Sequence, residues 1–278
     1  MKGFLFFDID GTLVDSEAGY MMPSKVSMDA IRQAQQNGYL CFIASGRNYG
    51  GMRQFEELGF DGFVYSDGAG ILCKNGISYS TPIPQKVLKK YLAEVKEYKA
   101  EIILATKDKL FASPRQYKDL FKSAESVARR QKCAPKEIMQ DWNIYHIEEY
   151  NGEDVMESDI SFESLQQEQN WLDHLDPELE YISTSASYGR GGNTAGEVTY
   201  HKVTKGNGCK KVVELFRGDM QNTYAFGDSM NDASMLEICQ YGIAMGNAVE
   251  ELKQKANYIT DSIEEDGLKK AMEHFQII

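Results

Sequence analysis

The chain has 278 residues, of which 42% are hydrophobic, so it is long enough to bury a sizeable core in one large domain or two smaller ones. Its formal net charge of -12 and its pI of about 4.9 disfavour nucleic acid and anionic membrane surfaces as partners, because an acidic surface repels phosphate groups. Any phosphate-binding site therefore needs local compensation from lysine, arginine, a helix N-terminus or a metal ion.

Cysteine usage and the N-terminal segment predict a cytoplasmic protein. The five cysteines are odd in number and scattered without a Cys-x-x-Cys pair, which is typical of a reducing compartment. Cys41 lies in an apolar run and is expected in the core rather than as a reactive thiol. The N-terminal apolar run is too short for a signal peptide, and no stretch approaches the length needed to span a bilayer.

The first third of the chain alternates short apolar runs with amphipathic stretches. Strands are expected at Phe4 to Phe7, Leu40 to Ala44 and Phe63 to Tyr65, with helices at Ser24 to Asn37 and Tyr49 to Leu58. Asn75-Gly76, between two apolar runs, predicts a tight β-hairpin. The alternation of strands and helices predicts a right-handed parallel α/β sheet.

The middle of the chain has a different pattern, which indicates a separate α+β domain. Its expected helices are at Gln85 to Tyr98, Arg115 to Gln131 and Leu165 to Leu172, and its expected strands are at Ile102 to Ala105, Ile144 to Ile147, Ile160 to Phe162 and Tyr181 to Thr184. Two proline-containing turns mark its entry, and a glycine-rich run at residues 189–193 lies near its exit.

The last third returns to strand-helix alternation. Strands are expected at Thr223 to Phe226, Ile243 to Met245 and Tyr258-Ile259, and helices at Gly206 to Phe216, Asp232 to Ile238, Val249 to Lys255 and Glu264 to Phe275. The simplest architecture is one Rossmann-like α/β core domain made of both chain ends, with the middle inserted into it.

Two acidic clusters follow expected strands. Asp8 and Asp10 come directly after the first strand, and Asp228 and Asp232 follow the apolar run that ends at Phe226. Ligands bind beyond the carboxyl ends of strands in an open parallel sheet, and paired carboxylates there can share a hard divalent cation. One carboxylate can also attack phosphorus while another moves protons. Capping of turns is the alternative role, but two clusters at two strand ends are harder to explain in that way.

Two further segments could hold phosphate. Ser45-Gly46-Arg47 ends the second expected strand and offers a hydroxyl and backbone N–H groups, while Arg47 could either face substrate or form a structural salt bridge. Lys205 opens a helix, where a cation is disfavoured by the helix dipole. A bound anion would remove that conflict, and a solvated lysine is the alternative.

Taken together and in this order, these segments resemble the haloacid dehalogenase superfamily of phosphatases, specifically its Cof-type branch with a class C2 cap. The matching motifs are Asp8-x-Asp10-Gly11-Thr12-Leu13, Ser45-Gly46-Arg47, Lys205-Gly206, Gly227-Asp228-x-x-Asn231-Asp232, and the tail Gly242 to Ala248. The resemblance covers residues 1–83 and 197–278 as the core domain. Residues 84–196 match the specificity-determining cap only in size and position.

The sequence departs from the family pattern at two places. The branch usually has Asn-Gly-Ala after the third strand, and this chain has Asp67-Gly68-Ala69. The segment before Lys205 reads Tyr200-His201-Lys202 in place of the usual proline-rich turn. Neither departure affects the four core motifs, but both bear on which substrate is accepted.

The resemblance implies a role for each matching residue. Asp8 attacks phosphorus and becomes an aspartyl phosphate, while Asp10 protonates the leaving oxygen and then activates water. The cofactor Mg²⁺ is held by Asp8, the Asp10 backbone carbonyl and Asp228. The phosphate oxygens are bound by Ser45, Gly46, Lys205 and Asn231. Residues in supporting positions are Asp232, Thr12 and Arg47.

The predicted function is a Mg²⁺-dependent phosphatase whose partner is a small phosphate monoester, a sugar phosphate in preference to a phosphorylated cofactor. A sugar phosphomutase uses the same intermediate, and water access decides between the two. A non-catalytic phosphate-binding regulatory protein on this fold is a further alternative, disfavoured by the intact Asp8, Asp10, Lys205 and Asp228 set. A phospho-accepting signalling domain is disfavoured by the inserted domain and by Lys205.

Overall fold

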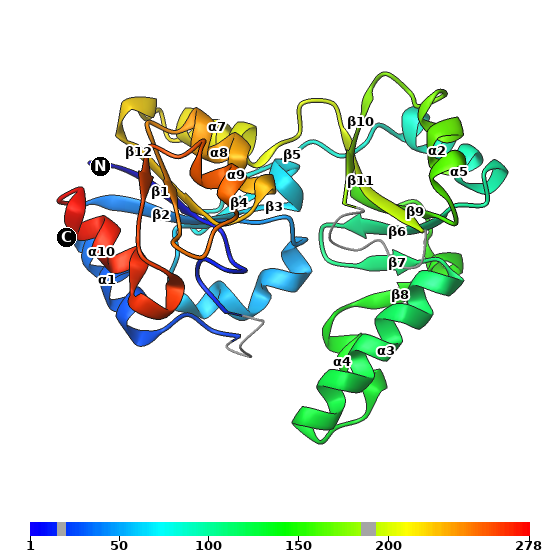
Figure 1. Ribbon diagram of the computed structural model, residues 1–278, viewed down its shortest axis with the longest axis horizontal. Helices are drawn as coiled ribbons and strands as arrows, with labels where there is room; N and C mark the ends of the chain where they lie inside the picture. The colour runs from blue at the N-terminus through cyan, green and yellow to red at the C-terminus, as the bar shows by residue number, and fades with distance from the viewer. Residues whose placement is uncertain (16–20, 185–192) are drawn as a thin grey trace. The chain divides into compact units, whose positions relative to one another are not determined.

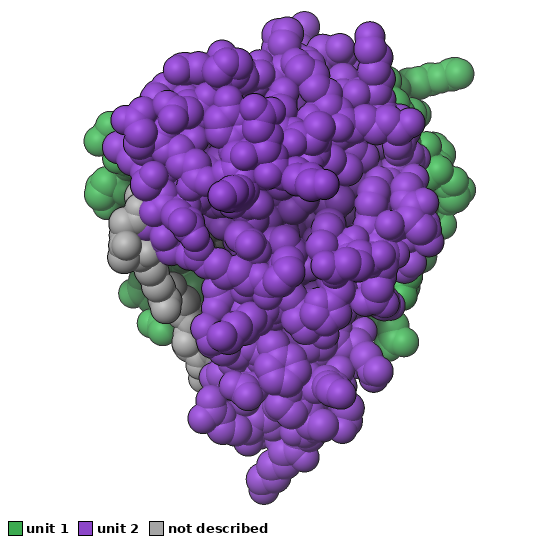
Figure 2. Space-filling view, turned by 90° about the vertical axis from the view of Figure 1, so that its right-hand side faces the viewer, with its two compact units in different colours: residues 1–47, 52–80, 203–278 green, residues 48–51, 81–202 purple. Residues whose placement is uncertain are grey.

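The computed structural model describes residues 1–15, 21–184 and 193–278. The chain divides into two compact units, which Figure 2 distinguishes by colour: residues 1–47, 52–80 and 203–278 form the first, and residues 48–51 and 81–202 form the second. Strand β11, Thr194–Tyr200, spans the expected boundary between the inserted domain and the C-terminal part of the core, at residues 196–197. The chain therefore returns to the first unit after residue 202. Most of the glycine-rich run expected at that exit lies outside the described residues.

The first unit is built on one eight-stranded sheet with the order β14-β13-β12-β1-β2-β3-β4-β5 (Figure 1). Neighbouring strands from β14 to β3 are parallel, and β4 and β5 continue the sheet as an antiparallel edge. The strands are β1 Gly3–Phe7, β2 Tyr39–Ala44, β3 Gly62–Tyr65, β4 Gly70–Cys73, β5 Ser78–Ser80, β12 Thr223–Gly227, β13 Tyr241–Ala244 and β14 Tyr258–Ile259. The expected hairpin is confirmed by the pairing of β4 with β5.

Helices cover both faces of this sheet. On one face Phe4, Phe6 and Phe42 share a buried cluster with Val212 of α7 and Leu236 of α8. Side chains alternate along a strand, so Cys41 of β2 points to the other face, where its thiol reaches the Ile31 carbonyl of α1. Figure 1 shows α10 beside α1 on that side. The buried position of Cys41 confirms its prediction as a core residue.

The helices of the first unit begin close to the residues expected from the sequence. The α-helices are α1 Lys25–Gln36, α7 Lys205–Leu215, α8 Ala233–Ile238, α9 Glu250–Lys253 and α10 Gly267–His274. The 3₁₀ segments are η1 Tyr49–Leu58, of which the first three residues belong to the second unit, η2 Ser66–Gly68, η4 Met220–Asn222, η5 Met230–Asp232 and η6 Ile263–Glu265. The helix expected at Tyr49 to Leu58 is therefore present but wound as 3₁₀, and two adjacent glycines in its first turn weaken α-helical winding there.

The second unit contains a six-stranded sheet with the order β10-β11-β9-β6-β7-β8 (Figure 1). All its strand pairs are antiparallel except β7 with β8. Its strands are β6 Glu101–Thr106, β7 Leu110–Ala112, β8 Ile144–His146, β9 Val155–Phe162, β10 Leu179–Ser183 and β11 Thr194–Tyr200. Its helices are α2 Gln85–Glu97, α3 Pro114–Gln131, α4 Pro135–Asp141, α5 Leu165–Leu172 and the 3₁₀ segment η3 Ile147–Glu149.

Two apolar clusters hold the second unit together. In the larger one Tyr91 of α2 and Trp171 of α5 are buried against Phe162 of β9. The smaller one joins α3 and α4 to Ile144 of β8. Within the three described ranges, no helix is both long enough and apolar enough to cross a membrane.

Candidate active site

The predicted acidic clusters lie at the carboxyl ends of adjacent strands. Phe7 of β1 pairs with Phe226 of β12, and the Asp8 backbone N–H donates to the Phe226 carbonyl at 3.0 Å. The two parallel strands therefore end together, with Asp8 following one and Asp228 the other. Ser45 follows β2, which is the neighbour of β1 on its other side. The parallel topology thus places three predicted motifs along one edge of the sheet.

Lys205 is buried between two carboxylates of this edge. Its Nζ lies 2.7 Å from Asp8 Oδ1 and 2.6 Å from Asp232 Oδ1, and its side chain is 1% exposed. The alternative of a solvated lysine is therefore wrong. Burial alone would lower the pKa of Lys205, but the surrounding carboxylates, Asp232 foremost, raise it well above its ordinary value. The ammonium group stays charged beside the first turn of α7 because these anions compensate it.

The carboxylates of Asp8, Asp228 and Asp232 form one acidic cluster, with an oxygen from each lying within 4.8 Å of the others. Burial, followed by the charge of Asp232, raises the pKa of Asp8 well above its ordinary value and that of Asp228 to about 7. Three acidic groups around one ammonium leave an excess of negative charge. Hard carboxylate oxygens with uncompensated charge fit a divalent cation such as Mg²⁺.

Asp232 uses both oxygens inside the protein. Oδ1 contacts Lys205, while Oδ2 accepts hydrogen bonds from the backbone N–H groups of Asp228 at 3.0 Å and Ser229 at 3.1 Å. The side chain is completely buried. This geometry suits the supporting role predicted for Asp232, because its contacts fix the lysine and the turn that carries Asp228.

The turn after β1 is shaped to fit Asp228. Thr12 donates from Oγ1 to Asp228 Oδ1 at 2.9 Å. Gly11 has a positive φ of 84°, and a Cβ at this position would lie 2.3 Å from Asp228 Oδ2. The Asn247 side-chain amide donates to the Gly11 carbonyl at 2.8 Å. Asn247 belongs to the recognised tail motif, but the sequence alone assigned it no role.

Asp10 does not join the carboxylate cluster. Its two oxygens accept hydrogen bonds from the Arg47 guanidinium, at 3.0 Å from Nε and 2.7 Å from Nη2. Of the two roles left open for Arg47, the structure therefore contains the salt bridge. An Asp10 side chain turned toward Arg47 leaves only its backbone carbonyl for the metal role that the family resemblance implies.

The predicted phosphate loop is held by residues that follow β3. The backbone N–H groups of Ser66 and Asp67 donate to the carbonyls of Arg47 at 2.9 Å and Ser45 at 3.2 Å. Asp67 adopts a left-handed backbone, with φ 47° and ψ 32°, to make this turn. The Asp67-Gly68-Ala69 segment departs from the family pattern, and its contact with the phosphate loop follows from the pairing of β2 with β3.

The remaining predicted phosphate ligands occupy different surroundings. Gly46 lies against the Asp67 carboxylate, since a Cβ built on Gly46 would be 3.3 Å from it. Ser45 is buried, and its Oγ accepts a hydrogen bond from the Arg47 backbone N–H at 3.2 Å. Asn231 is exposed at the turn after β12, where its amide oxygen accepts a hydrogen bond from Ser229. Their phosphate-binding roles stay predictions.

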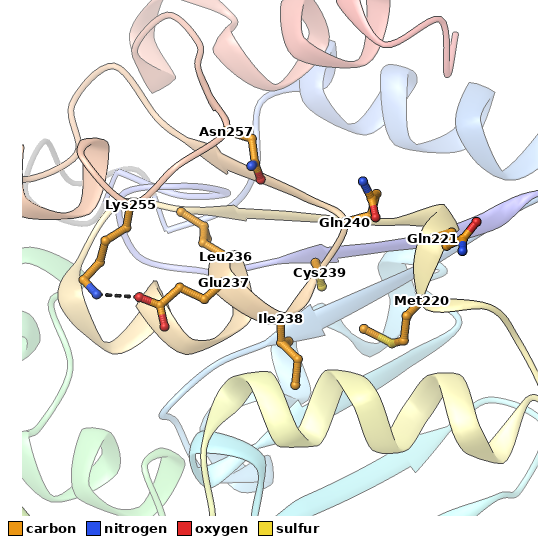
Figure 3. A pocket seen from close by; sticks show the side chains of 9 residues that line it. All are labelled: Met220, Gln221, Leu236, Glu237, Ile238, Cys239, Gln240, Lys255 and Asn257. Carbon is orange, nitrogen blue, oxygen red and sulfur yellow. Dashed lines mark hydrogen bonds and ion pairs between the residues drawn. The ribbon is translucent and has the colours of Figure 1, made fainter.

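A separate cavity of about 450 Å³ lies at the opposite edge of the sheet. It is bordered by the end of α8 and by residues that lie within three positions before β12, β13 and β14, among them Gln221, Gln240 and Asn257 (Figure 3). A Lys255–Glu237 ion pair lines it. It contains none of the predicted site residues, because these lie at the carboxyl ends of the strands.

Comparison with known proteins identifies a family over nearly the whole chain. The haloacid dehalogenase-like hydrolase family matches residues 5–272. The Bacillus subtilis (strain 168) protein YkrA, whose name assigns it provisionally as a phosphatase, is 27% identical over 275 residues, which cover 99% of this chain and 98% of YkrA.

The fold is also found in solved structures, among them two that are similar to this chain. A hypothetical protein from Geobacillus kaustophilus matches with a TM-score of 0.80 at 24% identity over 100% of both chains, and this likeness concerns the fold alone. BT4131, described as a sugar phosphatase of haloacid dehalogenase subclass IIB, matches with a TM-score of 0.73 at 29% identity over 99% of this chain and 100% of its own. The predicted α/β fold and phosphatase class are confirmed, and the chain belongs to the haloacid dehalogenase-like hydrolase family.

Proposed function

We propose that this chain is a Mg²⁺-dependent phosphatase that hydrolyses a small phosphate monoester through a phosphorylated Asp8. The observation that carries the proposal is the buried Lys205 ammonium, which lies 2.7 Å from Asp8 Oδ1 inside a cluster of carboxylates. A lysine in this position can orient the nucleophile and also offset negative charge on a transferring phosphoryl group. Preorganised positive charge of this kind is the main requirement of phosphoryl transfer.

In the first step Asp8 is the nucleophile. Lys205 holds its Oδ1, which leaves Oδ2 to attack phosphorus. A bond forms between Asp8 and phosphorus while the bond from phosphorus to the ester oxygen breaks. The leaving oxygen takes a proton from the Asp10 carboxyl group, so an alcohol departs and Asp8 carries the phosphoryl group.

In the second step water hydrolyses the aspartyl phosphate. Asp10, now ionised, accepts a proton from the water molecule as the water oxygen attacks phosphorus. The bond between phosphorus and the Asp8 oxygen breaks, which releases inorganic phosphate and restores both carboxyl groups. Arg47 contacts both Asp10 oxygens and therefore bears directly on this proton transfer.

The acidic cluster supplies the residues for a metal site. We expect the carboxylates of Asp8 and Asp228, with the Asp10 backbone carbonyl, to hold Mg²⁺. Asp232 is less suited to direct ligation, since both its oxygens already accept hydrogen bonds from protein groups. When bound, Mg²⁺ would supply positive charge that polarises the phosphoryl oxygens.

Phosphate recognition is assigned to the loop after β2 and to Lys205. The Ser45 hydroxyl and the Gly46 backbone N–H can donate hydrogen bonds from the loop after β2, which pairs with the nucleophile-bearing strand β1, and Asn231 can add an amide from the turn after β12. These groups bind oxygens that do not react, so they position the phosphorus atom for in-line attack.

We infer that the substrate is a small sugar phosphate. The net charge of -12 disfavours polymeric phosphate, whose binding needs several basic contacts. BT4131, which matches nearly all of this chain at 29% identity, is described as a sugar phosphatase. The second unit, residues 81–202, is the part of the chain that we expect to select the substrate.

The test is a competition among hexose phosphates, pyridoxal phosphate, flavin mononucleotide and a phosphopeptide with Mg²⁺, measured as phosphate release. Asp8→Asn protein prepared in parallel controls for contaminating phosphatases. We expect the highest kcat/KM with a hexose phosphate and no turnover by the variant. A preference for the phosphopeptide would contradict the substrate class, and activity retained by Asp8→Asn would contradict the mechanism.

A further inference from the structure

The Asp10 carboxylate has a single side-chain partner among the described residues, and that partner is Arg47. The contact is two-pronged, with Nε donating to Oδ2 at 3.0 Å and Nη2 donating to Oδ1 at 2.7 Å. A planar guanidinium that meets both oxygens fixes the plane of the carboxylate as well as its position. The Asp10 side chain is 43% exposed, so little else restrains it.

Arg47 is itself held in place through its backbone. Its N–H donates to Ser45 Oγ at 3.2 Å, and its carbonyl accepts from the Ser66 backbone N–H at 2.9 Å. These contacts attach Arg47 to the carboxyl ends of β2 and β3. The guanidinium therefore connects a rigid part of the sheet to a carboxylate on the turn after β1.

We propose that Arg47 is a positioning residue that orients Asp10 for proton transfer to the leaving oxygen and from the attacking water. This inference rests on the proposed function. Each carboxylate oxygen has two lone-pair directions, and the guanidinium occupies one on each oxygen, so the opposite directions stay available for the transferred proton. Arg47 acts through Asp10 and does not bind the phosphoryl group.

The choice of leaving group distinguishes a residue that orients Asp10 from one that binds the phosphoryl group or has a structural role. An alkoxide needs a proton as it departs, whereas nitrophenolate is stable enough to leave without one. We therefore expect Arg47→Ala to lower kcat by about 100-fold with an alkyl phosphate and by less than about tenfold with p-nitrophenyl phosphate. Arg47→Lys keeps the positive charge but cannot contact both Asp10 oxygens in the same bidentate way. It should therefore restore only part of the kcat that Arg47→Ala loses with the alkyl ester.

A second measurement tests whether Arg47 acts through Asp10. Asp10→Asn and the double variant Asp10→Asn/Arg47→Ala should hydrolyse the alkyl phosphate at rates within about threefold of each other, because residues that act as a unit are not additive. Arg32→Ala is the matched control, since Arg32 forms an exposed pair with Asp29 on α1. It should leave kcat unchanged with both esters.

The possible outcomes separate the inference from the proposed function. The inference is wrong if the wild-type protein hydrolyses both esters but Arg47→Ala lowers both rates equally. It is also wrong if the losses of the two single variants multiply in the double variant. In either case Arg47 contacts the substrate or has a merely structural role. Equal losses in melting temperature for Arg47→Ala and Arg32→Ala, together with the leaving-group dependence, support it. Absence of turnover in the wild-type protein would overturn the proposed function and the inference with it.

Discussion

Lys205 Nζ and Asp232 Oδ1 lie 2.6 Å apart in a part of the first unit where both side chains are buried. The second Asp232 oxygen accepts hydrogen bonds from the turn that carries Asp228. One aspartate thus links the positive charge of the site to its acidic turn. Lys205, Asp232 and the turn that carries Asp228 therefore form one buried network of charges and hydrogen bonds, so loss of one side chain should alter the electrostatics of the rest.

Lys205→Ala should lower kcat/KM, which corresponds to a rise of about 2–4 kcal/mol in the activation free energy. The reason is that it removes one preorganised charge that stabilises the transferring phosphoryl group. Steady-state kinetics with p-nitrophenyl phosphate measures this. Lys210→Ala, at an exposed position of the same helix, is the control and should leave the rate unchanged. A loss smaller than about twofold at Lys205 would show that the buried lysine has no part in the reaction.

Asp228→Asn should raise the Mg²⁺ concentration needed for half-maximal activity, or abolish activity, because it removes a charged hard-oxygen ligand. Chelation should likewise stop hydrolysis, and added Mg²⁺ should restore it. Glu237→Gln changes an acidic residue outside the cluster and should leave the Mg²⁺ dependence as it is. Full wild-type activity in excess chelator would contradict the metal assignment.

Gly11→Ala should impair Mg²⁺ binding, because its Cβ would lie 2.3 Å from Asp228 Oδ2 and displace that carboxylate. Gly76→Ala is a matched control, since Gly76 has a similar φ of 86° but open space around it. Both variants should lose about 1–2 kcal/mol of unfolding free energy from backbone strain. Only Gly11→Ala should also require more Mg²⁺, and an identical response of the two variants would contradict this account.

Asp10→Asn should slow the release of an alkyl alcohol far more than the release of nitrophenolate, because the amide has no proton to give to the leaving oxygen. The second half-reaction should also slow, since the amide cannot accept a proton from water. Rapid-quench measurements separate the two steps. An equal effect on both leaving groups would show that Asp10 does not act as the acid.

The strand ends of the core were predictable from the sequence because two signals coincide there. A short apolar run followed at once by Asp8, or by Gly227-Asp228, identifies both the strand and the start of the site. The parallel pairing of β1 with β12 follows from strand-helix alternation at both chain ends. The closeness of Asp8 and Asp228 was therefore foreseeable although 220 positions separate them along the chain.

Other features depend on tertiary contacts that a local pattern does not carry. Strand β7 has only three residues, and β11 begins next to residues rich in glycine, so neither gives a clear period-two signal. Gly196 in β11 is required because the Tyr181 ring covers it, and a Cβ there would lie 2.1 Å from that ring. The Arg47–Asp10 contact joins the loops that follow β2 and β1, so it depends on the pairing of these two strands.

The most direct test of the account is to locate the covalent phosphate. Protein with Asp10→Asn, in which hydrolysis of the intermediate is slowed, is mixed with p-nitrophenyl phosphate and Mg²⁺, quenched in acid and analysed by peptide mass spectrometry. We predict a phosphoryl group on Asp8, and none when Asp8→Asn is combined with Asp10→Asn. The central claim would be contradicted if the wild-type protein turns over substrate, no phosphate is found on Asp8 in the Asp10→Asn protein, and Asp8→Asn keeps ordinary turnover.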